Sequence, residues 1–449
     1  MDKINEKTIS DFLSQEYKDF ALYTIESRAI GSCIDGFKPV QRKIIFICND
    51  IWRTGNEKPL KVFQLAGSVA SQAYYHHGSS SLESAIINMA QSFKNNMSLL
   101  EEHGQFGSIR CTTAGAPRYI GTKLNNNFRL LYKDFELLDY KQEEGVGIEP
   151  EYFLPIIPTI LINGSSGIAV GFASNILNRN PIDIINACEQ LLKGKKIVDV
   201  SPHSNFFNGT YTQDKDNHKR WFIRGIVKIV NTSTARIDEL PPSMTYEKYE
   251  VVLDGLVDDK VIVSYDDNCK DSVNYLIKFN RETLAQLDEE KLIKLLKLEE
   301  TSTEIFTTLD EFGELKIFEN SKEIIEYFVN FRLTFYVKRK EFILDKLNRE
   351  LKILSNKGKF IKAILDGKLE IKNRSKEDII KDIENLGLEK VDDSFDYLLR
   401  MPLWSLTKEL FEKLKGDYKD KKTEIEEFSK IEPKKMYIDD LSDLKKKMK

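Results

Sequence analysis

The stretch KVFQLAGSVASQAYYHHGSSSLESAIINMAQSF, residues 61–93, decides the fold that we predict for the first part of this chain. Residues 61–72 have the composition of a helix, and after a short His-His-Gly turn a second helix is expected to open with Ser80 and Glu83 as a capping box. Its apolar side chains recur at helical spacing, at Leu82, Ala85, Ile86, Met89 and Ala90. This pattern indicates a helix-turn-helix, and the spaced glycines of residues 101–119 indicate a wing after it.

The predicted wing ends on a tyrosine that follows an arginine. In AGAPRYIGTKL, residues 114–124, Arg118 precedes Tyr119 among small residues. A phenol with a pKa of about 10 is roughly 0.1% ionised at neutral pH, so it attacks phosphate only where a cation or a base favours the phenolate. Arg118 offers that charge and a bidentate grip on phosphate. The chain has 18 tyrosines, and most such pairs are structural, so the neighbouring segments have to decide.

Two neighbouring segments carry groups that bind phosphate. In SRAIGSCIDGFKPVQRKII, residues 27–45, a turn at Asp35 and Gly36 is surrounded by four cations, Arg28, Lys38, Arg42 and Lys43. In YYHHGSSSL, residues 74–82, the expected helix start offers free backbone N–H groups beside His76 and His77, of which His77, next to Gly78, is expected to face the reacting group. A solvated basic helix start and two ordinary turn histidines are the alternatives.

A long apolar run, YFLPIIPTILINGSSGIAVGFASNI, occupies residues 152–176. Its prolines and glycines exclude a membrane helix, and it lacks the GxxxxGK[ST] pattern of a phosphate loop. Ile168, between glycines, is interpreted either as an exposed wedge that enters a DNA base step or as an ordinary core isoleucine.

Taken together and in this order, the motifs resemble the breakage-reunion region of the type IIA DNA topoisomerases. SRAIGSCIDGFKPVQRK is similar to the RAxPxxxDGLKPVQRR start of that family, YYHHGSSSL to its YHHG motif, and GQFGS and APRYI to its NGxFGS and AxRYI. The run at residues 152–176 resembles PxxLxNGxxGIAxGxxxxIP, ARIDELPP at residues 235–242 resembles the ITELP signature, and DYLLRMPLWSLT at residues 396–407 resembles a motif of the carboxyl-terminal gate.

The resemblance implies roles for individual residues. Tyr119 is then the nucleophile that forms a 5′-phosphotyrosyl link, and Arg118, Arg28 and His77 assist at the phosphate. Ile168 is the DNA-bending wedge. Further DNA contacts are expected from Lys38, Arg42, Lys43, His76, Gly78 and Ser80. The rival hypothesis is a non-catalytic winged-helix DNA-binding or architectural dimer in which Tyr119 is structural.

The sequence contains no counterpart of the family's Toprim metal signature and no ATPase phosphate loop. We therefore expect a naturally separate cleavage subunit that forms a homodimer through its carboxyl-terminal gate and binds double-stranded DNA. Mg²⁺, which stabilises the leaving and non-bridging oxygens, and ATP are then expected on a partner large subunit that carries the Toprim and ATPase parts. No metal site is expected on this chain.

We predict an α/β multi-domain protein. Residues 1–145 are assigned to a winged-helix (CAP-like) cleavage domain, residues 146–320 to a mixed α/β tower domain, and residues 321–449 to an antiparallel coiled coil with a helical dimer gate. The coiled coil is expected to pair a helix over residues 322–354 with one over residues 407–428, although an ordinary helical hairpin is the commoner explanation of the periodicity. The final DLSDLKKKMK is either a solvated tail or a segment that packs near the coiled coil.

The composition limits the kinds of site and the compartment that we expect. A chain of 449 residues with a net charge of −4 is not globally basic, so any DNA footprint has to be local. Five scattered cysteines without a CxxC indicate free thiols in a reducing compartment rather than disulfides or zinc. With neither a signal peptide nor a transmembrane span in the sequence, we expect a cytoplasmic protein without a membrane partner.

Overall fold

The computed structural model describes residues 8–55, 58–109, 111–270, 272–371, 374–391, 393–402 and 407–448. The chain divides into two compact units, one formed by Met1–Arg332 with Asp440–Lys449 and the other by Leu333–Asp439. In the described ranges no helix is long and apolar enough to cross a membrane.

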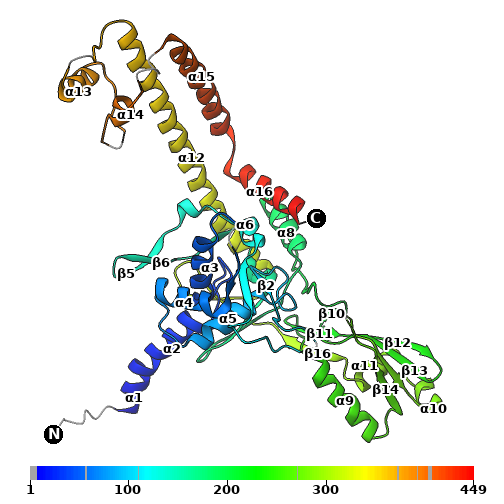
Figure 1. The fold of residues 1–449 in the computed structure, drawn as a ribbon. Coiled ribbons are helices and arrows are strands. Elements are labelled where there is room, and N and C mark those ends of the chain that lie inside the picture. The colour runs from blue at the N-terminus through cyan, green and yellow to red at the C-terminus, as the bar shows by residue number, and fades with distance from the viewer. Residues whose placement is uncertain are drawn as a thin grey trace, which may run out of the picture. The chain divides into compact units, whose positions relative to one another are not determined.

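The first unit begins with an uninterrupted helical run that leads into the basic segment (Figure 1). The run consists of α1 (Ile9–Phe12), the π-helical turn η1 (Leu13–Tyr17), α2 (Lys18–Thr24) and a second π-helical turn, η2 (Ile25–Ala29). Arg28 lies in η2, and π-helical turns are frequent at functional sites because they re-aim the side chains that they carry.

Three helices and a small sheet follow. They are α3 (Pro39–Ile51), α4 (Val62–Gln72), α5 (Ser79–Ala90), β1 (Leu60–Lys61), β2 (Leu100–His103) and β3 (Gly121–Leu124), and the antiparallel sheet has the order β1-β3-β2. The two helices predicted from residues 61–93 are therefore present. The predicted capping box is wrong: α5 begins at Ser79 after Gly78, and Gly78 caps it with no side-chain hydrogen bond.

A buried carboxylate organises the centre of this unit. Asp35 accepts hydrogen bonds from the backbone N–H groups of Phe37 (3.0 Å) and Phe153 (3.1 Å), and its carbonyl accepts from the hydroxyls of Tyr132 (2.9 Å) and Thr159 (2.7 Å). Gly36 has φ +74°, and a Cβ there would lie 2.7 Å from Thr159 Oγ1, so the turn requires glycine. The Asp-Gly turn is thus a buried packing centre, not a solvated loop.

Short elements connect this centre to the following region. They are α6 (Asn126–Leu131), β4 (Tyr132–Lys133), the 3₁₀ turn η3 (Phe135–Leu137), β5 (Tyr140–Glu143), β6 (Val146–Pro150), β7 (Leu154–Pro155), α7 (Thr159–Asn163), β8 (Ser165–Ile168), β9 (Ala173–Ile176) and α8 (Pro181–Leu192). Three pairs of these strands are antiparallel: β4 with β7, β5 with β6 and β8 with β9. The last two pairs are hairpins of consecutive strands. The apolar run at residues 152–176 is therefore broken into a strand, a helical turn and a hairpin, as its prolines and glycines predicted.

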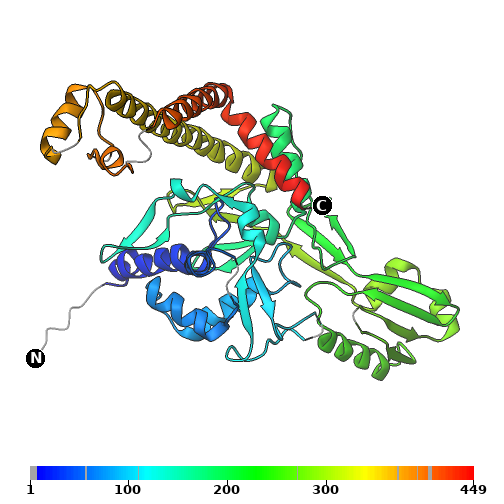
Figure 2. The same cartoon turned by 45° about the horizontal axis from the view of Figure 1, so that its top comes forward.

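Residues 181–320 form a mixed α/β region (Figure 2), which contains two larger antiparallel sheets and the two-stranded antiparallel sheet β17-β18. The three-stranded sheet has the order β10-β11-β16 and the four-stranded sheet the order β12-β13-β15-β14. The strands are β10 (Thr210–Gln213), β11 (Arg220–Arg224), β12 (Ile226–Asn231), β13 (Thr234–Glu239), β14 (Ser264–Asp267), β15 (Tyr275–Lys278), β16 (Glu299–Thr303), β17 (Phe306–Leu309) and β18 (Leu315–Phe318), and the helices are α9 (Tyr246–Asp258), α10 (Arg281–Ala285) and α11 (Glu289–Leu295). Tyr249 and Tyr275 lie in the core between the four-stranded sheet and these helices.

The second unit is helical. It contains most of α12 (Ser321–Leu365), together with α13 (Lys376–Asn385), α14 (Asp396–Leu399) and α15 (Lys408–Lys430). Lys340 Nζ donates to Ser429 O (2.7 Å) and Lys421 pairs with Glu350 (3.0 Å), so α12 and α15 run antiparallel. The helix predicted to end at residue 354 continues to Leu365 because Phe360, Ala363 and their neighbours pack into the small core under α13 and α14.

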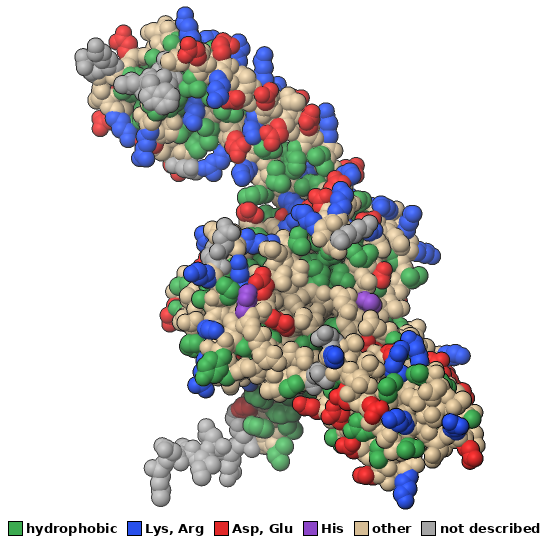
Figure 3. All heavy atoms as spheres, turned by 45° about the vertical axis from the view of Figure 1, so that its right-hand side comes forward, with side chains coloured by type: hydrophobic (Ala, Val, Ile, Leu, Met, Phe, Trp, Pro, Cys, Tyr) green, Lys and Arg blue, Asp and Glu red, His purple; other side chains and the backbone are tan. Residues whose placement is uncertain are grey.

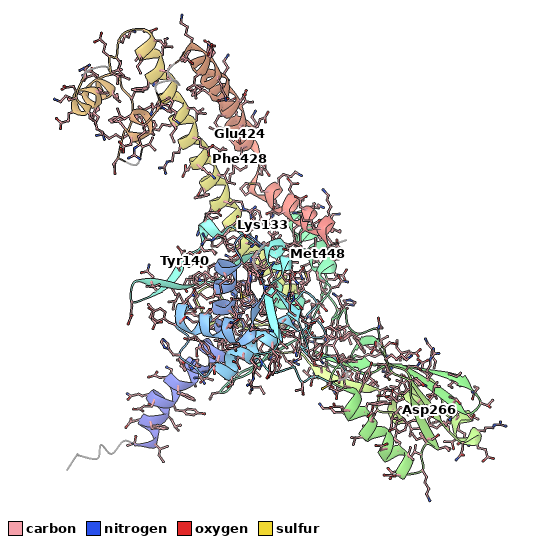
Figure 4. All side chains as sticks on the ribbon, in the orientation of Figure 1. Lys133, Tyr140, Asp266, Glu424, Phe428 and Met448 are labelled. Atoms are coloured by element: carbon pink, nitrogen blue, oxygen red, sulfur yellow. The ribbon has the colours of Figure 1, made fainter. Side chains whose placement is uncertain are left out.

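The gate motif at residues 396–407 is described only in part, since residues 403–406 lie outside the described residues. The final segment belongs to α16 (Pro433–Lys447), in which Leu441 and Leu444 are buried. Lys133 Nζ lies 2.8 Å from Asp440, and Figure 4 labels Lys133. The solvated-tail alternative is therefore wrong, because this end of the chain packs on the first unit.

Candidate active site

Tyr119 lies in a tight turn just before β3, and this turn packs against the start of α4, where the N–H of Phe63 donates to Pro117 O (3.3 Å). The N–H of Tyr119 donates to Ala116 O (2.8 Å), and Lys61 Nζ donates to Tyr119 O (2.7 Å). The side chain is 71% exposed, and the Arg118 guanidinium lies 5.5 Å from the centre of its ring. The backbone of the turn is thus held in place while the phenol faces outward, and an attacking group needs this presentation.

A second cluster surrounds His77. Arg28 Nη2 lies 3.3 Å from His77 Nδ1, and the Tyr23 hydroxyl lies 3.2 Å from His77 Nε2. Burial, helped by the positive charges of Arg28 and His76, lowers the pKa of His77 below its ordinary value of 6.5. The imidazole is therefore neutral at neutral pH. Since a guanidinium only donates, Nδ1 accepts from Arg28 and Nε2 carries the proton.

A cavity of about 550 Å³ joins this cluster to other predicted residues, and Arg28, Lys43, His76 and His77 all line it. Lys43 Nζ donates to Ala73 O (2.6 Å) and lies 3.8 Å from Glu149, while burial lowers its pKa. His76 Nε2 lies 3.0 Å from a Glu143 oxygen. The cavity is therefore lined by three cations, Arg28, Lys43 and Lys141, and three carboxylates, Glu26, Glu143 and Glu149, and it is large enough to hold a phosphodiester group.

Arg42 does not join this surface. Its side chain is buried, and Nε and Nη2 contact the two oxygens of Asp35 at 2.7 and 3.1 Å. The guanidinium is therefore held inside the packing centre, where it orders the Asp35 turn and does not line the cavity around His77. A DNA contact from Arg42 stays a prediction.

Ile168 lies at the end of the β8–β9 hairpin and is 88% exposed. The core-isoleucine alternative is therefore wrong. Lys38 Nζ donates to Ser166 O (2.7 Å), and a Cβ on Gly167 would lie 1.9 Å from Ala29 O. The hairpin is thus seated directly against η2, and a side chain at Gly167 could not be accommodated without moving one of them.

Gly78 and Ser80 lie at the start of α5 and are exposed. Because the N–H of Ser81 donates to Gly78 O (3.2 Å) and no side chain caps the helix, polar groups at this end face solvent. The α5 start is therefore placed as the sequence predicted, with a different cap.

Cations are not gathered across the whole surface. On the face drawn in Figure 3, Lys and Arg side chains are interspersed with Asp and Glu. This agrees with the local footprint expected from the net charge of −4. Among the described residues there is no group of three or more His, Cys, Asp or Glu side chains that could hold a metal ion.

Sequence reasoning missed three residues of these sites. Lys61 anchors the carbonyl of Tyr119, Tyr23 contacts His77, and Glu143 contacts His76. The partners in these pairs lie 58, 54 and 67 positions apart, so no local pattern could join them. Tyr119 and Arg118 do not line the cavity around Arg28. The predicted site residues therefore fall into two groups within the first unit.

Comparison with known families identifies this arrangement. The family profile that describes the A-subunit of DNA gyrase/topoisomerase IV matches residues 28–443. The chain belongs to this DNA gyrase/topoisomerase IV A-subunit family. The match confirms the resemblance to the type IIA breakage-reunion region that the motifs indicated.

Two relatives of this chain are eukaryotic enzymes. The chain is 36% identical over 463 residues to the mitochondrial DNA topoisomerase 2 of Dictyostelium discoideum, covering 98% of this chain and 35% of that protein. It is 34% identical over 482 residues to DNA topoisomerase 2-beta of Mus musculus, covering 97% of this chain and 30% of that protein. The chain thus spans about a third of the length of the curated relatives it matches.

A solved structure shares the fold. The DNA-binding, cleavage and re-ligation domain of Plasmodium falciparum topoisomerase II superposes with a TM-score of 0.84 at 32% identity, covering 98% of this chain and 64% of that chain. The similarity therefore extends over nearly the whole of this chain, both units included.

Proposed function

We propose that this chain is the DNA cleavage and rejoining subunit of an ATP-dependent type IIA DNA topoisomerase. The observation that carries the proposal is the exposed Tyr119 beside Arg118, on an anchored turn, in a chain of this family. Two copies each cut one strand of a duplex, a second duplex passes through the break, and both strands are rejoined.

The proposed chemistry is a reversible transesterification. The Tyr119 oxygen attacks the phosphorus, the Tyr119 O–P bond forms, the P–O3′ bond breaks, and the 3′ oxygen leaves and takes a proton. The phenolic proton passes to a base or to water. The attached phosphoester conserves the bond energy, so the reverse attack by the 3′ hydroxyl needs no ATP. Arg118 favours the phenolate and the charged transition state.

Arg28 and His77 are proposed to hold the reacting phosphate. Arg28 donates to non-bridging oxygens, and neutral His77 keeps Arg28 aimed by accepting one of its N–H groups at 3.3 Å. A neutral imidazole is the form that can accept this hydrogen bond, because the protonated ring has no acceptor nitrogen. These residues bind and orient, whereas Tyr119 reacts.

The DNA contacts around this chemistry are proposed from exposed and cavity-lining groups. We assign them to Lys38, Lys43, His76, Gly78 and Ser80, with Ile168 as the wedge that opens a base step. The helices α3–α5 and the sheet β1-β3-β2 support a winged-helix arrangement with α5 as the recognition helix.

The remaining parts of the holoenzyme are proposed to lie on a partner. A Toprim/ATPase large subunit supplies ATP hydrolysis and the Mg²⁺ site, where the ion stabilises the leaving and non-bridging oxygens. We propose a homodimer through the carboxyl-terminal gate and a location in the cytoplasm. Sequence resemblance further supports a chain like the medium subunit of the T-even-type phage topoisomerase, in which case the cytoplasm is that of the host.

We also propose three functional domains. Residues 1–145 carry the nucleophile, residues 146–320 form a tower along the DNA flank, and residues 321–449 form a coiled coil and gate. The antiparallel α12 and α15 and the small core beneath α13 and α14 support the last assignment.

A covalent-adduct assay tests the proposal. This chain and its Toprim-bearing partner are mixed with supercoiled plasmid and Mg²⁺, stopped with denaturant, and compared with Tyr119→Phe. We expect protein on 5′ ends with the wild type and a decrease of on the order of 10⁴-fold or more with the variant, since the phenyl ring has no nucleophile. If neither the wild type nor the variant forms a covalent adduct, although both bind DNA and the partner is verified as active, the result would support the architectural dimer.

A further inference from the structure

A second cavity, of about 630 Å³, lies beside the first and is called here the α5–hairpin groove. Its walls are the start of α3, one face of α5, the turn at residues 94–95 and the β8–β9 hairpin. The two cavities share Arg28, Val40 and Ser81, so the groove continues from the His77 cluster to the hairpin that carries Ile168.

Two ammonium groups in the groove have no carboxylate partner among the described residues. Lys38 Nζ donates to Ser166 O (2.7 Å) and Lys94 Nζ to Asn88 Oδ1 (2.9 Å), and neither forms an ion pair. An ammonium group has three donors, so each keeps two for a ligand. Burial lowers the pKa of both groups, so an anion in the groove would relieve part of the cost of their charges.

The other lining groups favour an anion as well. Asp35 is the one carboxylate among the described lining residues, and both of its oxygens contact Arg42. Ser81 and Ser84 stand three positions apart on α5, and their hydroxyls make no hydrogen bond within the part of the chain that the structure describes. The groove therefore offers cations and free hydroxyl donors without a competing free carboxylate.

Lys94 is held in a fixed turn. Its carbonyl accepts from Asn178 Nδ2 (3.0 Å) at the end of the hairpin, and the neighbouring Asn95 Nδ2 donates to Gln91 O (2.9 Å) on α5. The turn is thus tied to both walls of the groove. A lysine held this way loses less conformational freedom on binding than a lysine on an open surface.

We propose that the α5–hairpin groove is a second phosphate site, in which Lys94 and Lys38 bind a backbone phosphodiester of the DNA between the cleaved bond and the wedge step. This inference rests on the proposed function for the identity of the ligand. The groove would hold the strand while Ile168 enters the base stack, so that bending and cleavage act on one positioned backbone.

The test measures binding of the full chain to a duplex of about 30 base pairs, long enough for a groove contact of this kind, by fluorescence anisotropy at several salt concentrations. Lys94→Gln is expected to weaken binding about 3- to 10-fold and to make the slope of log K against log salt shallower by about 0.9, the change for one lost phosphate contact. Lys94→Arg is expected to keep the wild-type slope. Lys434→Gln, which removes an exposed lysine of α16 outside the groove, is the matched control and is expected to leave the slope unchanged.

A scan of the same duplex with single neutral methylphosphonates locates the contact. We expect one or two positions between the cleaved bond and the wedge step at which a methylphosphonate lowers the affinity of the wild type. At these positions it should not lower the affinity of Lys94→Gln any further. If Lys94→Gln keeps the wild-type slope, or loses affinity at the same methylphosphonate positions as the wild type, the groove does not hold the backbone. A groove that binds only free phosphate would show no positional effect, and this also contradicts the proposal.

The result is separable from the proposed function. The covalent-adduct assay is run in parallel with the wild-type holoenzyme. A methylphosphonate effect that depends on Lys94, without any covalent adduct from an active partner, would retain the groove and remove the cleavage role. An adduct with no dependence on Lys94 would do the reverse.

Discussion

Two tyrosines of this chain lie equally far from an arginine but differ in their exposure and in the contacts of their hydroxyl groups. The Tyr119 ring centre is 5.5 Å from the Arg118 guanidinium, and the Tyr23 ring centre is 5.5 Å from that of Arg28. The Tyr23 hydroxyl accepts a hydrogen bond from His77 Nε2 (3.2 Å) and the side chain is 45% exposed, whereas Tyr119 is 71% exposed. The distance to an arginine alone therefore does not select between the two tyrosines, but the engaged hydroxyl of Tyr23 does.

The comparison shows that presentation and activation are divided between two places. Tyr119 faces outward from an anchored turn, and the groups that we propose to hold phosphate line the cavity around His77. In that arrangement Tyr23 belongs to the grip, because its hydroxyl is engaged with His77. The following variants test this division of roles.

Arg28 is expected to give the largest effect among the gripping residues. Arg28→Gln removes charge-assisted donors from the phosphate and should slow single-turnover cleavage of a labelled duplex by about 10²–10³-fold, as for one lost transition-state donor. Arg28→Lys keeps the charge without the fork and should recover part of the rate. Arg53→Gln, an exposed arginine paired with Asp50, is the control. If Arg28→Gln is as active as this control, the grip lies elsewhere.

The protonation of His77 comes next. Its pKa lies below the ordinary 6.5 because of burial and then the charges of Arg28 and His76, so the neutral form is present above that pKa. Acidification through the pKa adds a charge beside Arg28 and removes the acceptor at Nδ1. The cleavage rate should therefore fall about 10- to 100-fold as the pH drops through this lowered pKa, and it should stay level from pH 6.5 upward.

The His77→Gln variant separates this group from others that titrate. It should cleave slowly, and its pH profile should show no acidic break below pH 6.5, where the lowered pKa of His77 lies. The exposed His218→Gln is the matched control and should keep the wild-type profile. An acidic break that persists in His77→Gln would assign it to another group.

Tyr23→Phe is expected to have the smallest effect. It removes one hydrogen bond to His77 (3.2 Å), an interaction worth about 1 kcal/mol, and should slow cleavage about 2- to 5-fold while covalent adduct still forms. Tyr17→Phe on the same helical run is the control. A loss of all adduct with Tyr23→Phe would overturn the division of roles, because Tyr23 would then be reacting.

Much of the fold followed from local patterns. The spacing of apolar residues in residues 61–93 predicted α4 and α5, and the prolines and glycines of residues 152–176 predicted a broken run. The cap of α5 was predicted wrongly because three adjacent serines follow Gly78, and backbone geometry rather than side-chain chemistry selects the cap. Helix α12 was shortened because the core that holds its last turns comes from residues later in the chain.

Site residues divide in the same way. Neighbours in sequence, such as Arg118 and Tyr119, could be predicted directly. Arg42 could not be distinguished from Lys38 by sequence, because burial against Asp35 depends on Phe153 and Thr159, which lie more than a hundred positions away. Lys94 gave no signal, since its groove is assembled from residues that lie between positions 28 and 178 of the chain.

The most direct test of the central claim identifies the tyrosine that carries DNA. The wild-type holoenzyme is trapped on a cleavable duplex with denaturant, digested with nuclease and protease, and the modified peptide is mapped by mass spectrometry. We expect a nucleotide attached through its 5′ phosphate to Tyr119 and to no other tyrosine. Attachment to Tyr23, or to any residue other than Tyr119, would contradict the claim.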